Sequence, residues 1–437
     1  MMDSQLHRLA ALHQSAAPHQ LAAPRRATSR RATSRREFLR SGAAASAVMT
    51  FSATAPGVLR AAVTQEPSNE NILVVVEMAG GNDGLNTVIP HGDPIYRKSR
   101  PNLAIASNTV AKLNSELGLH PSMRGFADLL EDGQFSVVQG VGYENPNRSH
   151  FESMDIWHSC LRKDETRLDG WLGRYLDQVQ AENWSDPGAV HLGQDKQPFA
   201  LMSRDVRVPS IQSLAQFRLR GGESPEFRQT LDQVLESETE STGNDLLGFV
   251  QSSTSNAIAA SRRMESAGTK YQPTKPYPTS GLGRKLETVA KLIAGGLQTR
   301  VYYVRIDGFD THANQPDAHA ALLREVSEAV TSFVQDVNSH GDGDRLMVMC
   351  FSEFGRRVAE NASDGTDHGT AGPILLAGSR ANAGLIGEHP SLSHLDQGDL
   401  KYHTDFRQVY ATLIEDWLGG ESSTVLSGEF KKLNLFT

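Results

Sequence analysis

The apolar run that begins at Ile72 constrains the fold of this chain more than any other feature of the sequence. Residues 72–78 read ILVVVEM and are apolar at every position except Glu77. A strand with one face in water alternates apolar and polar residues, whereas a strand of a parallel sheet is covered on both faces and is apolar throughout. The run therefore predicts a buried strand of a parallel sheet.

Further strands and helices are expected to alternate along the chain. Strands are expected at 134–142, 196–203, 299–308, 344–355 and 372–378. Helices are expected at 120–133, 149–161, 170–180, 280–297, 322–337 and 404–419. In the fifth of these helices the apolar residues recur every three or four positions, at Leu322, Val326, Val330, Phe333 and Val337. The pattern predicts a doubly wound α/β fold, with a mainly parallel sheet and helices on both faces.

The first 64 residues differ from the rest. The stretch SRREFLR, at 34–40, pairs Arg35 with Arg36 and precedes a mild Ala/Gly/Val-rich segment. This combination is typical of a twin-arginine export signal, and a basic arm that binds anions is the alternative. The segment is too polar for a stable transmembrane anchor. We therefore expect a protein exported by the twin-arginine route to the periplasm or the outside of the cell.

Residues 65–437 are expected to form the α/β domain. Within it, 221–277 is polar and Ser/Glu-rich, and it is interpreted as a helical insertion or cap. A formal net charge of -8 argues against a nucleic-acid partner. Cys160 and Cys350 form no metal-binding pattern, and one disulfide between them is left open.

Charged and imidazole side chains follow the ends of several expected strands. Asp83, Asp310, His312 and Glu353 come just past strand ends, and His368 lies in the loop before another strand. Ligands gather at the carboxyl ends of strands in such folds. These residues are therefore candidate metal ligands, and their mixed N/O character suits Zn²⁺, Mn²⁺ or Fe²⁺.

Three neighbouring residues are candidates for catalysis. Ser149 begins an expected helix, where free backbone N–H groups favour an anion or an alkoxide. His150 stands beside it, and Arg148 is placed to pair with an anionic substrate. The alternative is that Ser149 is a plain helix cap.

The metal candidates also have alternative interpretations. The GGND sequence around Asp83 is ordinary turn chemistry, and Asp310 or Thr311 is able to cap a helix. Glu353 has Arg356 and Arg357 as nearby ion-pair partners, and His368 has the alternative of an ordinary loop histidine.

Seven ordered blocks resemble the family catalogued as domain of unknown function 1501. They are VEMAGGNDGLNTVIP, LGLHPSM, NPNRSHFESMDIW, GFDTHANQ, FSEFGRRVAEN, GTDHGTAGP and TDFRQVYATLIEDWLG. This family in turn is similar to the alkaline phosphatase-like superfamily, which includes phosphatases and sulfatases. The resemblance implies the order Asp83, Ser149, Asp310 with His312, Glu353, His368. Two features depart from the superfamily: the gap between Asp310 and His312 is shorter, and Phe354 stands where a histidine is expected.

The sequence thus predicts an exported, metal-dependent, sulfatase-like hydrolase that acts on small anionic phosphate or sulfate esters. The working hypothesis is that Asp310, His312 and His368 hold a divalent ion while Ser149 attacks the ester. Because Phe354 supplies no ligand, one metal site is favoured over two, with Asp83 and Glu353 placing a second cation if one binds. The alternative is a catalytically degenerate protein of the cell envelope that keeps the fold and has a binding or structural role.

Overall fold

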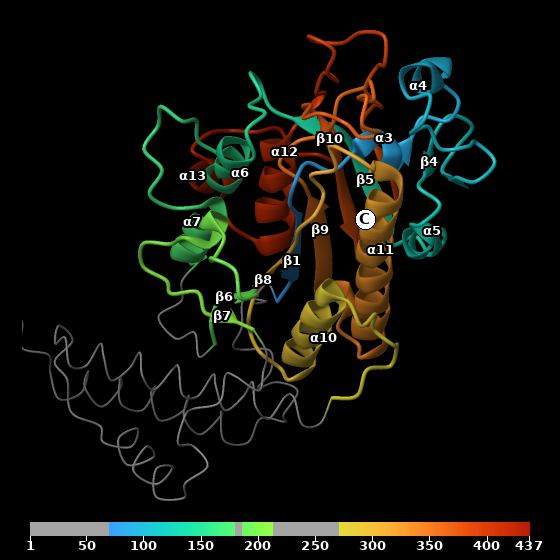
Figure 1. Cartoon of the computed structure of the whole chain (residues 1–437). Coiled ribbons are helices and arrows are strands. Elements are labelled where there is room, and N and C mark those ends of the chain that lie inside the picture. Colours follow the sequence, from blue (N-terminus) through green and yellow to red (C-terminus); the bar gives the residue numbers. More distant parts are fainter. Residues whose placement is uncertain (1–69, 180–185, 213–270) are drawn as a thin grey trace, which may run out of the picture. The chain divides into compact units, whose positions relative to one another are not determined.

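The computed structural model describes residues 70–179, 186–212 and 271–437 (Figure 1). The expected export signal at 1–64 lies outside the described residues. Of the expected insertion at 221–277, only 271–277 is described, and it runs without helix or strand.

The centre of the described domain is a nine-stranded sheet with the order β11-β5-β10-β9-β1-β8-β6-β7, in which β12 also pairs with β5. The strands are β1 (Ile72–Met78), β5 (Phe135–Gly142), β6 (Ala189–Leu192), β7 (Ser210–Ile211), β8 (Val301–Ile306), β9 (Leu346–Phe351), β10 (Gly372–Ala377), β11 (Gly384–Ile386) and β12 (Thr404–Asp405). Neighbours run parallel except around β10, which is antiparallel to both β9 and β5. The predicted mainly parallel sheet is confirmed.

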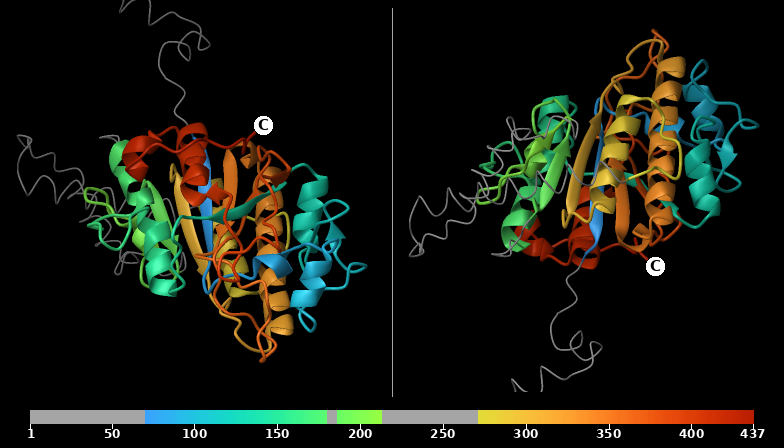
Figure 2. Two further views of the ribbon diagram at one scale, coloured as in Figure 1. Left: turned by 90° about the horizontal axis from the view of Figure 1, so that it is seen from above. Right: turned by 90° about the horizontal axis from the view of Figure 1, so that it is seen from below.

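Helices cover both faces of this sheet (Figure 2). One face carries α5 (Arg124–Glu131), α10 (Gly281–Ala294) and α11 (Gln315–Ser339). The other carries α6 (His150–Ser159), α7 (Trp171–Val179), α12 (Phe406–Thr412), the π-helical turn η4 (Leu413–Leu418) and α13 (Ser422–Leu426). The predicted doubly wound arrangement is therefore present.

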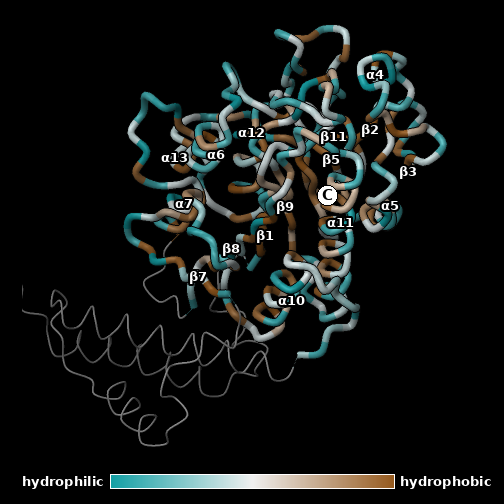
Figure 3. The backbone as a smooth tube through the Cα atoms, viewed as in Figure 1, coloured by the Kyte–Doolittle hydropathy of each residue, from teal (hydrophilic) through white to brown (hydrophobic). Residues whose placement is uncertain are grey.

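The apolar run at β1 follows from its place between the two helix layers. Val74 and Val76 face the core with α5, α10 and α11, whereas Leu73 and Val75 face the core with α6, α7 and α12. All four side chains are buried. Apolar residues accordingly line the central strands (Figure 3).

Smaller elements lie beside the main sheet. They are a second sheet with the order β2-β4-β3, formed by β2 (Val88–Ile89), β4 (Gly118–Leu119) and β3 (Ala111–Lys112), the helices α3 (Gly84–Thr87) and α4 (Pro94–Ser99), and the 3-10 turns η1 (Phe199–Leu201) and η3 (Gly343–Arg345).

The strand predicted at 196–203 is wrong, because this segment contains η1. Pro198 has no N–H for a ladder hydrogen bond, and its carbonyl accepts from Leu201 N at 3.0 Å, which closes a turn.

The helix predicted at 404–419 begins at Phe406, two residues after the predicted start. Asp405 caps this helix by accepting a hydrogen bond from Arg407 N. None of the helices in the described part of the chain is both long and apolar enough to cross a membrane.

Candidate metal centre

The candidate residues meet at the carboxyl ends of three adjacent strands. β1 lies between β8 and β9, and all three are parallel. Asp310 and His312 follow β8, and Glu353 follows β9. His368 lies in the loop before β10, and His150 is the first residue of α6. Parallel strands bring these side chains to one edge of the sheet.

Two glycines after β1 allow the loops at this edge to approach closely. Gly80 has φ of +120°, and a Cβ there would lie 2.4 Å from the backbone nitrogen of Asp310. Gly81 has φ of +75°, and a Cβ there would lie 2.3 Å from the Phe354 ring. Other residues are strained at these angles and would push the loops apart. The Gly-Gly pair is therefore required for the packing of the site.

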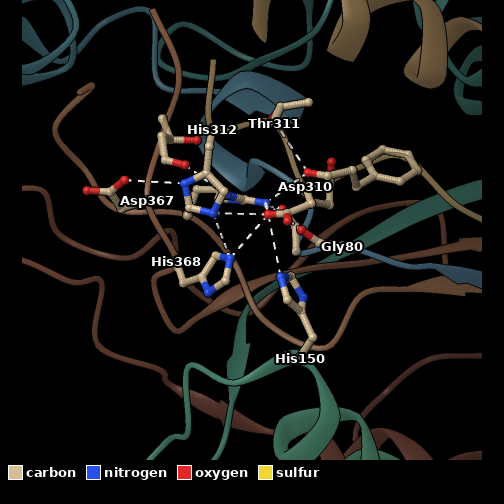
Figure 4. A network of polar contacts seen from close by, with 12 residues as sticks. Gly80, His150, Asp310, Thr311, His312, Asp367 and His368 are labelled. Atoms are coloured by element: carbon tan, nitrogen blue, oxygen red, sulfur yellow. Dashed lines mark hydrogen bonds and ion pairs between the residues drawn. The ribbon is translucent and has the colours of Figure 1, made fainter. Parts of the chain in front are cut away.

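Three imidazole rings surround one carboxylate oxygen (Figure 4). Asp310 Oδ1 lies 3.1 Å from His312 Nε2, 3.1 Å from His368 Nε2 and 3.4 Å from His150 Nε2. The Nε2 atoms of His312 and His368 are 2.9 Å apart. Among the described residues, ligand atoms of His150, Asp310 and His368 all lie within 4.8 Å of one another.

The other nitrogen of each ring contacts a hydrogen-bond acceptor. His150 Nδ1 lies 2.8 Å from Glu353 Oε1, and His312 Nδ1 lies 3.3 Å from Asp367 Oδ1. His368 Nδ1 lies 2.8 Å from the backbone carbonyl of Arg148. Since a carboxylate or carbonyl only accepts, each Nδ1 carries the proton, and a neutral ring then has a lone pair at Nε2. Such outer partners are typical of metal-binding histidines.

The distances between Asp310 Oδ1 and the Nε2 atoms suit ligands of one bound cation. Two atoms each about 2.1 Å from one ion lie about 3 Å apart for bonds at right angles and about 3.4 Å apart for tetrahedral bonds. The distances from Asp310 Oδ1 to the three Nε2 atoms are 3.1–3.4 Å, and the Nε2 atoms of His312 and His368 are 2.9 Å apart. His150 Nε2 is buried and has no hydrogen-bond partner. His150, Asp310 and His368 therefore fit a divalent metal ion, and His312 lies beside them with its Nε2 3.1 Å from Asp310 Oδ1.

A buried guanidinium completes the surroundings of Asp310. The Arg356 side chain is fully buried, and its Nη2 donates to Asp310 Oδ1 at 2.7 Å. Its N–H groups also donate to the backbone carbonyls of Gly80, Gly81, Phe309 and Thr366. Arg356 is thus a fixed positive charge beside the carboxylate, and no local sequence pattern indicates this role.

The electrostatic environment changes the ionisation of the cluster. Partial burial opposes ionisation of Asp310, but the contacts with Arg356 and His368 outweigh it and lower the pKa of this carboxyl to about 2. The hydrogen bond with Glu353 raises the pKa of His150. Burial lowers the pKa of His368 despite its contact with Asp310. Asp310 is therefore a carboxylate at neutral pH.

The candidate catalytic residues lie at the start of α6. Ser149 occupies the N-cap position and is exposed, but its side chain makes no capping hydrogen bond. Its backbone N–H donates to Asn147 Oδ1 at 2.8 Å. The Arg148 guanidinium contacts Asp399 Oδ2. The hydroxyl of Ser149 is therefore free of the local bond that the helix-cap interpretation requires.

Asp83 contacts Arg100 and Gln315, and no ring of the imidazole cluster is among its contacts in the described part of the chain. Asp83 Oδ2 lies 2.6 Å from Arg100 Nη1, and both side chains are fully buried. Burial opposes ionisation of Asp83, but the Arg100 guanidinium outweighs it and lowers the pKa of the carboxyl.

Glu353 contacts the cluster through His150. It also accepts hydrogen bonds from Gly80 N at 2.9 Å and from Ser352 Oγ at 2.9 Å, and it is buried. Arg356 pairs with Asp310 and Arg357 with Asp399, so the alternative in which an arginine holds Glu353 gains no support.

Phe354 forms an apolar wall of the site. Its ring centroid lies 5.0 Å from that of His150 and 4.8 Å from that of His368.

Two further questions from the sequence concern the helix cap and the cysteines. α11 begins at Gln315 after Asn314, so neither Asp310 nor Thr311 is a helix cap. Both cysteines are free and buried, and Cys160 has its pKa raised to about 12 by burial.

Solved structures that are similar to this chain include the following three. The zinc-bound C-terminal periplasmic domain of EcEptC from Escherichia coli is 10% identical with a TM-score of 0.38, over 72% of this chain and 75% of that chain. A sulfatase from Pseudoalteromonas sp. is 12% identical with a TM-score of 0.37, over 83% and 70% of the two chains. A Ps i-CgsB complex with neocarrahexaose is 11% identical with a TM-score of 0.34, over 83% and 73%.

No curated protein matches the sequence. The family described as protein of unknown function (DUF1501) matches residues 70–416, which include every element of the candidate centre. The expected family is confirmed, and the chain belongs to it.

Proposed function

We propose that this protein is an exported hydrolase of phosphate or sulfate esters that works with one divalent ion, zinc, manganese or iron. The ion would be held by His150, Asp310, His312 and His368. One observation carries this proposal: three Nε2 atoms face Asp310 Oδ1, while each Nδ1 is held by an acceptor. His150 thereby joins the ligand set instead of acting only beside Ser149.

The surrounding residues prepare the site. Glu353 and Asp367 orient two of the rings, and loss of such outer partners typically weakens metal binding about 10- to 100-fold. Arg356 balances the charge of Asp310 and opposes a second cation there, which favours one ion over two. A bound divalent ion would supply Lewis-acid polarisation of the ester. A second cation at Asp83 and Glu353 would have to displace Arg100 and His150 from them.

Ser149 is the proposed nucleophile. Its hydroxyl is exposed at the N-terminus of α6, where free backbone N–H groups favour an oxyanion. Its oxygen would form a bond to phosphorus or sulfur as the bond to the ester oxygen breaks, and the serine proton would leave with the released alcohol. Water would then release the bound anion and restore the serine.

The test is hydrolysis of 4-nitrophenyl phosphate and 4-nitrophenyl sulfate by protein purified without chelator. We expect His312→Ala and His368→Ala to lose metal and hydrolysis together, because the remaining ligands cannot complete the shell. His394→Ala is the matched control, since His394 is exposed and contacts Lys401 instead of the cluster. Parental metal content and activity in both cluster variants would refute the proposal.

Phe354 favours a second candidate function, binding of an anionic cell-envelope component without catalysis. Its buried ring fills space next to His150 and His368 and offers no lone pair to a second ion. Under this alternative the protein holds metal but turns over neither ester. Measurable hydrolysis that is lost in Ser149→Ala would exclude it.

Export by the twin-arginine route belongs to the same proposal. Replacing Arg35 and Arg36 with lysine should leave folded precursor in the cytoplasm, because the arginine pair is the proposed recognition element. Unchanged export of this variant would remove the twin-arginine assignment. The earlier pairs Arg25-Arg26 and Arg30-Arg31 are the controls, since they lack the following Phe-Leu.

A further inference from the structure

Two arginines share one buried carboxylate beside the candidate metal centre. The Arg148 guanidinium contacts Asp399 Oδ2, and Arg357 Nε lies 3.6 Å from Asp399 Oδ1. The Asp399 side chain is 1% exposed, whereas each arginine side chain is 36% exposed. The carboxylate is therefore internal, and both arginine side chains are partly exposed.

The backbone groups of both arginines form hydrogen bonds with residues of the candidate centre. The carbonyl of Arg148 is the acceptor that holds His368 Nδ1 at 2.8 Å. The backbone N–H of Arg357 donates at 3.0 Å to the carbonyl of Asp367, whose side chain contacts His312. The Arg148 guanidinium consequently lies within one arginine side chain of His368.

Asp399 faces two guanidinium groups, and neither of its oxygens receives a geometrically normal hydrogen bond. Asp396 also acts on Asp399, and Asp367 interacts with Arg357. A tight turn fixes Asp399, with Asp399 N donating to Asp396 O at 2.9 Å and Asp396 N donating to Asp399 O at 3.0 Å. A buried carboxylate with incomplete hydrogen bonding is costly unless cations face it. Asp399 thus holds two partly exposed arginines together.

We propose that Arg148 and Arg357 form a subsite for a second anionic group of the substrate, a sulfate, phosphate or carboxylate. Guanidinium groups present paired N–H donors that match such oxyanions. The inference rests on the proposed ester hydrolysis and narrows its substrates to molecules with at least two anionic groups. Asp399 is a positioning residue that acts through the two arginines.

The test is binding of a fluorescently labelled dextran sulfate oligomer to the whole, metal-replete protein, measured by anisotropy. Arg357→Gln and Arg148→Gln should each weaken binding about fivefold, as expected for half-exposed charges, with unchanged metal content. Arg124→Gln is the control, because Arg124 is 71% exposed on α5 and pairs with Asp128. Unchanged binding in both subsite variants, or an equal loss in Arg124→Gln, would overturn the inference.

A repeat of the titration after metal removal separates this inference from the proposed function. If the subsite is correct, Arg357→Gln should weaken binding of the oligomer by the same factor with and without metal, because neither arginine is a proposed metal ligand. If the parent holds no metal but Arg357→Gln weakens binding, the subsite stands and the hydrolase proposal fails. If metal and hydrolysis are present but Arg357→Gln binds the oligomer like the parent, the subsite fails alone.

Discussion

Arg100→Met tests whether Asp83 is a structural residue, as its ion pair indicates, or a metal ligand. The Arg100 guanidinium donates to Asp83 Oδ2 at 2.6 Å, to Asn86 Oδ1 at 2.9 Å, and to the carbonyls of Val358 and Arg357 at 2.9 and 2.8 Å. Methionine keeps much of the length but removes every donor. The variant therefore leaves a buried carboxylate without its cation.

Removing one partner of a buried ion pair typically costs about 3–5 kcal/mol. We expect Arg100→Met to lower the free energy of unfolding by that amount in urea denaturation at pH 7. Adding Asp83→Asn removes the unpaired charge, so the double variant should recover stability and differ from the parent by about 2 kcal/mol, for the two carbonyls left without donors. Metal content should equal that of the parent in both variants.

Arg124→Met is the matched control, because Arg124 is an exposed helix residue whose pair with Asp128 is worth about 0.5 kcal/mol. The reasoning fails if Arg100→Met is no more destabilising than this control, or if the double variant is less stable than the single one. Loss of metal in an otherwise stable Arg100→Met protein would place Asp83 in the metal site.

Three further predictions concern the nucleophile, the apolar wall and acid stability. Ser149→Ala should abolish ester hydrolysis with unchanged metal content, and surviving activity would point to water as the nucleophile. Phe354→His should allow a second ion to bind, measured as metal per chain, whereas two tightly held ions in the parent would contradict the assignment. Burial opposes ionisation of Glu77, but His158 and Tyr303 outweigh it and lower its pKa. Its stabilising contribution is therefore present above the unfolded pKa of about 4.3 and is lost as pH falls through the folded pKa. Glu77→Gln should flatten the acid dependence of unfolding in urea, and an unchanged slope would exclude this explanation.

The long central strands were predictable because burial on both faces leaves a direct sequence pattern. β1, β8 and β9 are apolar at nearly every position and lie side by side. Strands of two or three residues, such as β7 and β11, carry no such pattern and were not anticipated. In the segment at 196–203, Pro198 outweighed the apolar neighbours that suggested a strand.

The candidate site was predictable only in part. The rule that ligands gather at strand ends grouped Asp310, Glu353 and His368, which do lie at one edge. The contact of His150 with Asp310 depends on how α6 packs, and the two residues are far apart in the sequence. Arg356 and Arg100 each bury a guanidinium through contacts with distant backbone, and no local spacing indicates such contacts.

Anomalous diffraction at the metal absorption edge, from crystals of chelator-free protein, tests the central claim most directly. The account predicts one strong peak per chain, about 2.0–2.2 Å from Asp310 and from the Nε2 atoms of His150, His312 and His368. A strong peak at Asp83, or no peak in crystals grown with excess Zn²⁺, Mn²⁺ and Fe²⁺ in turn, would contradict it.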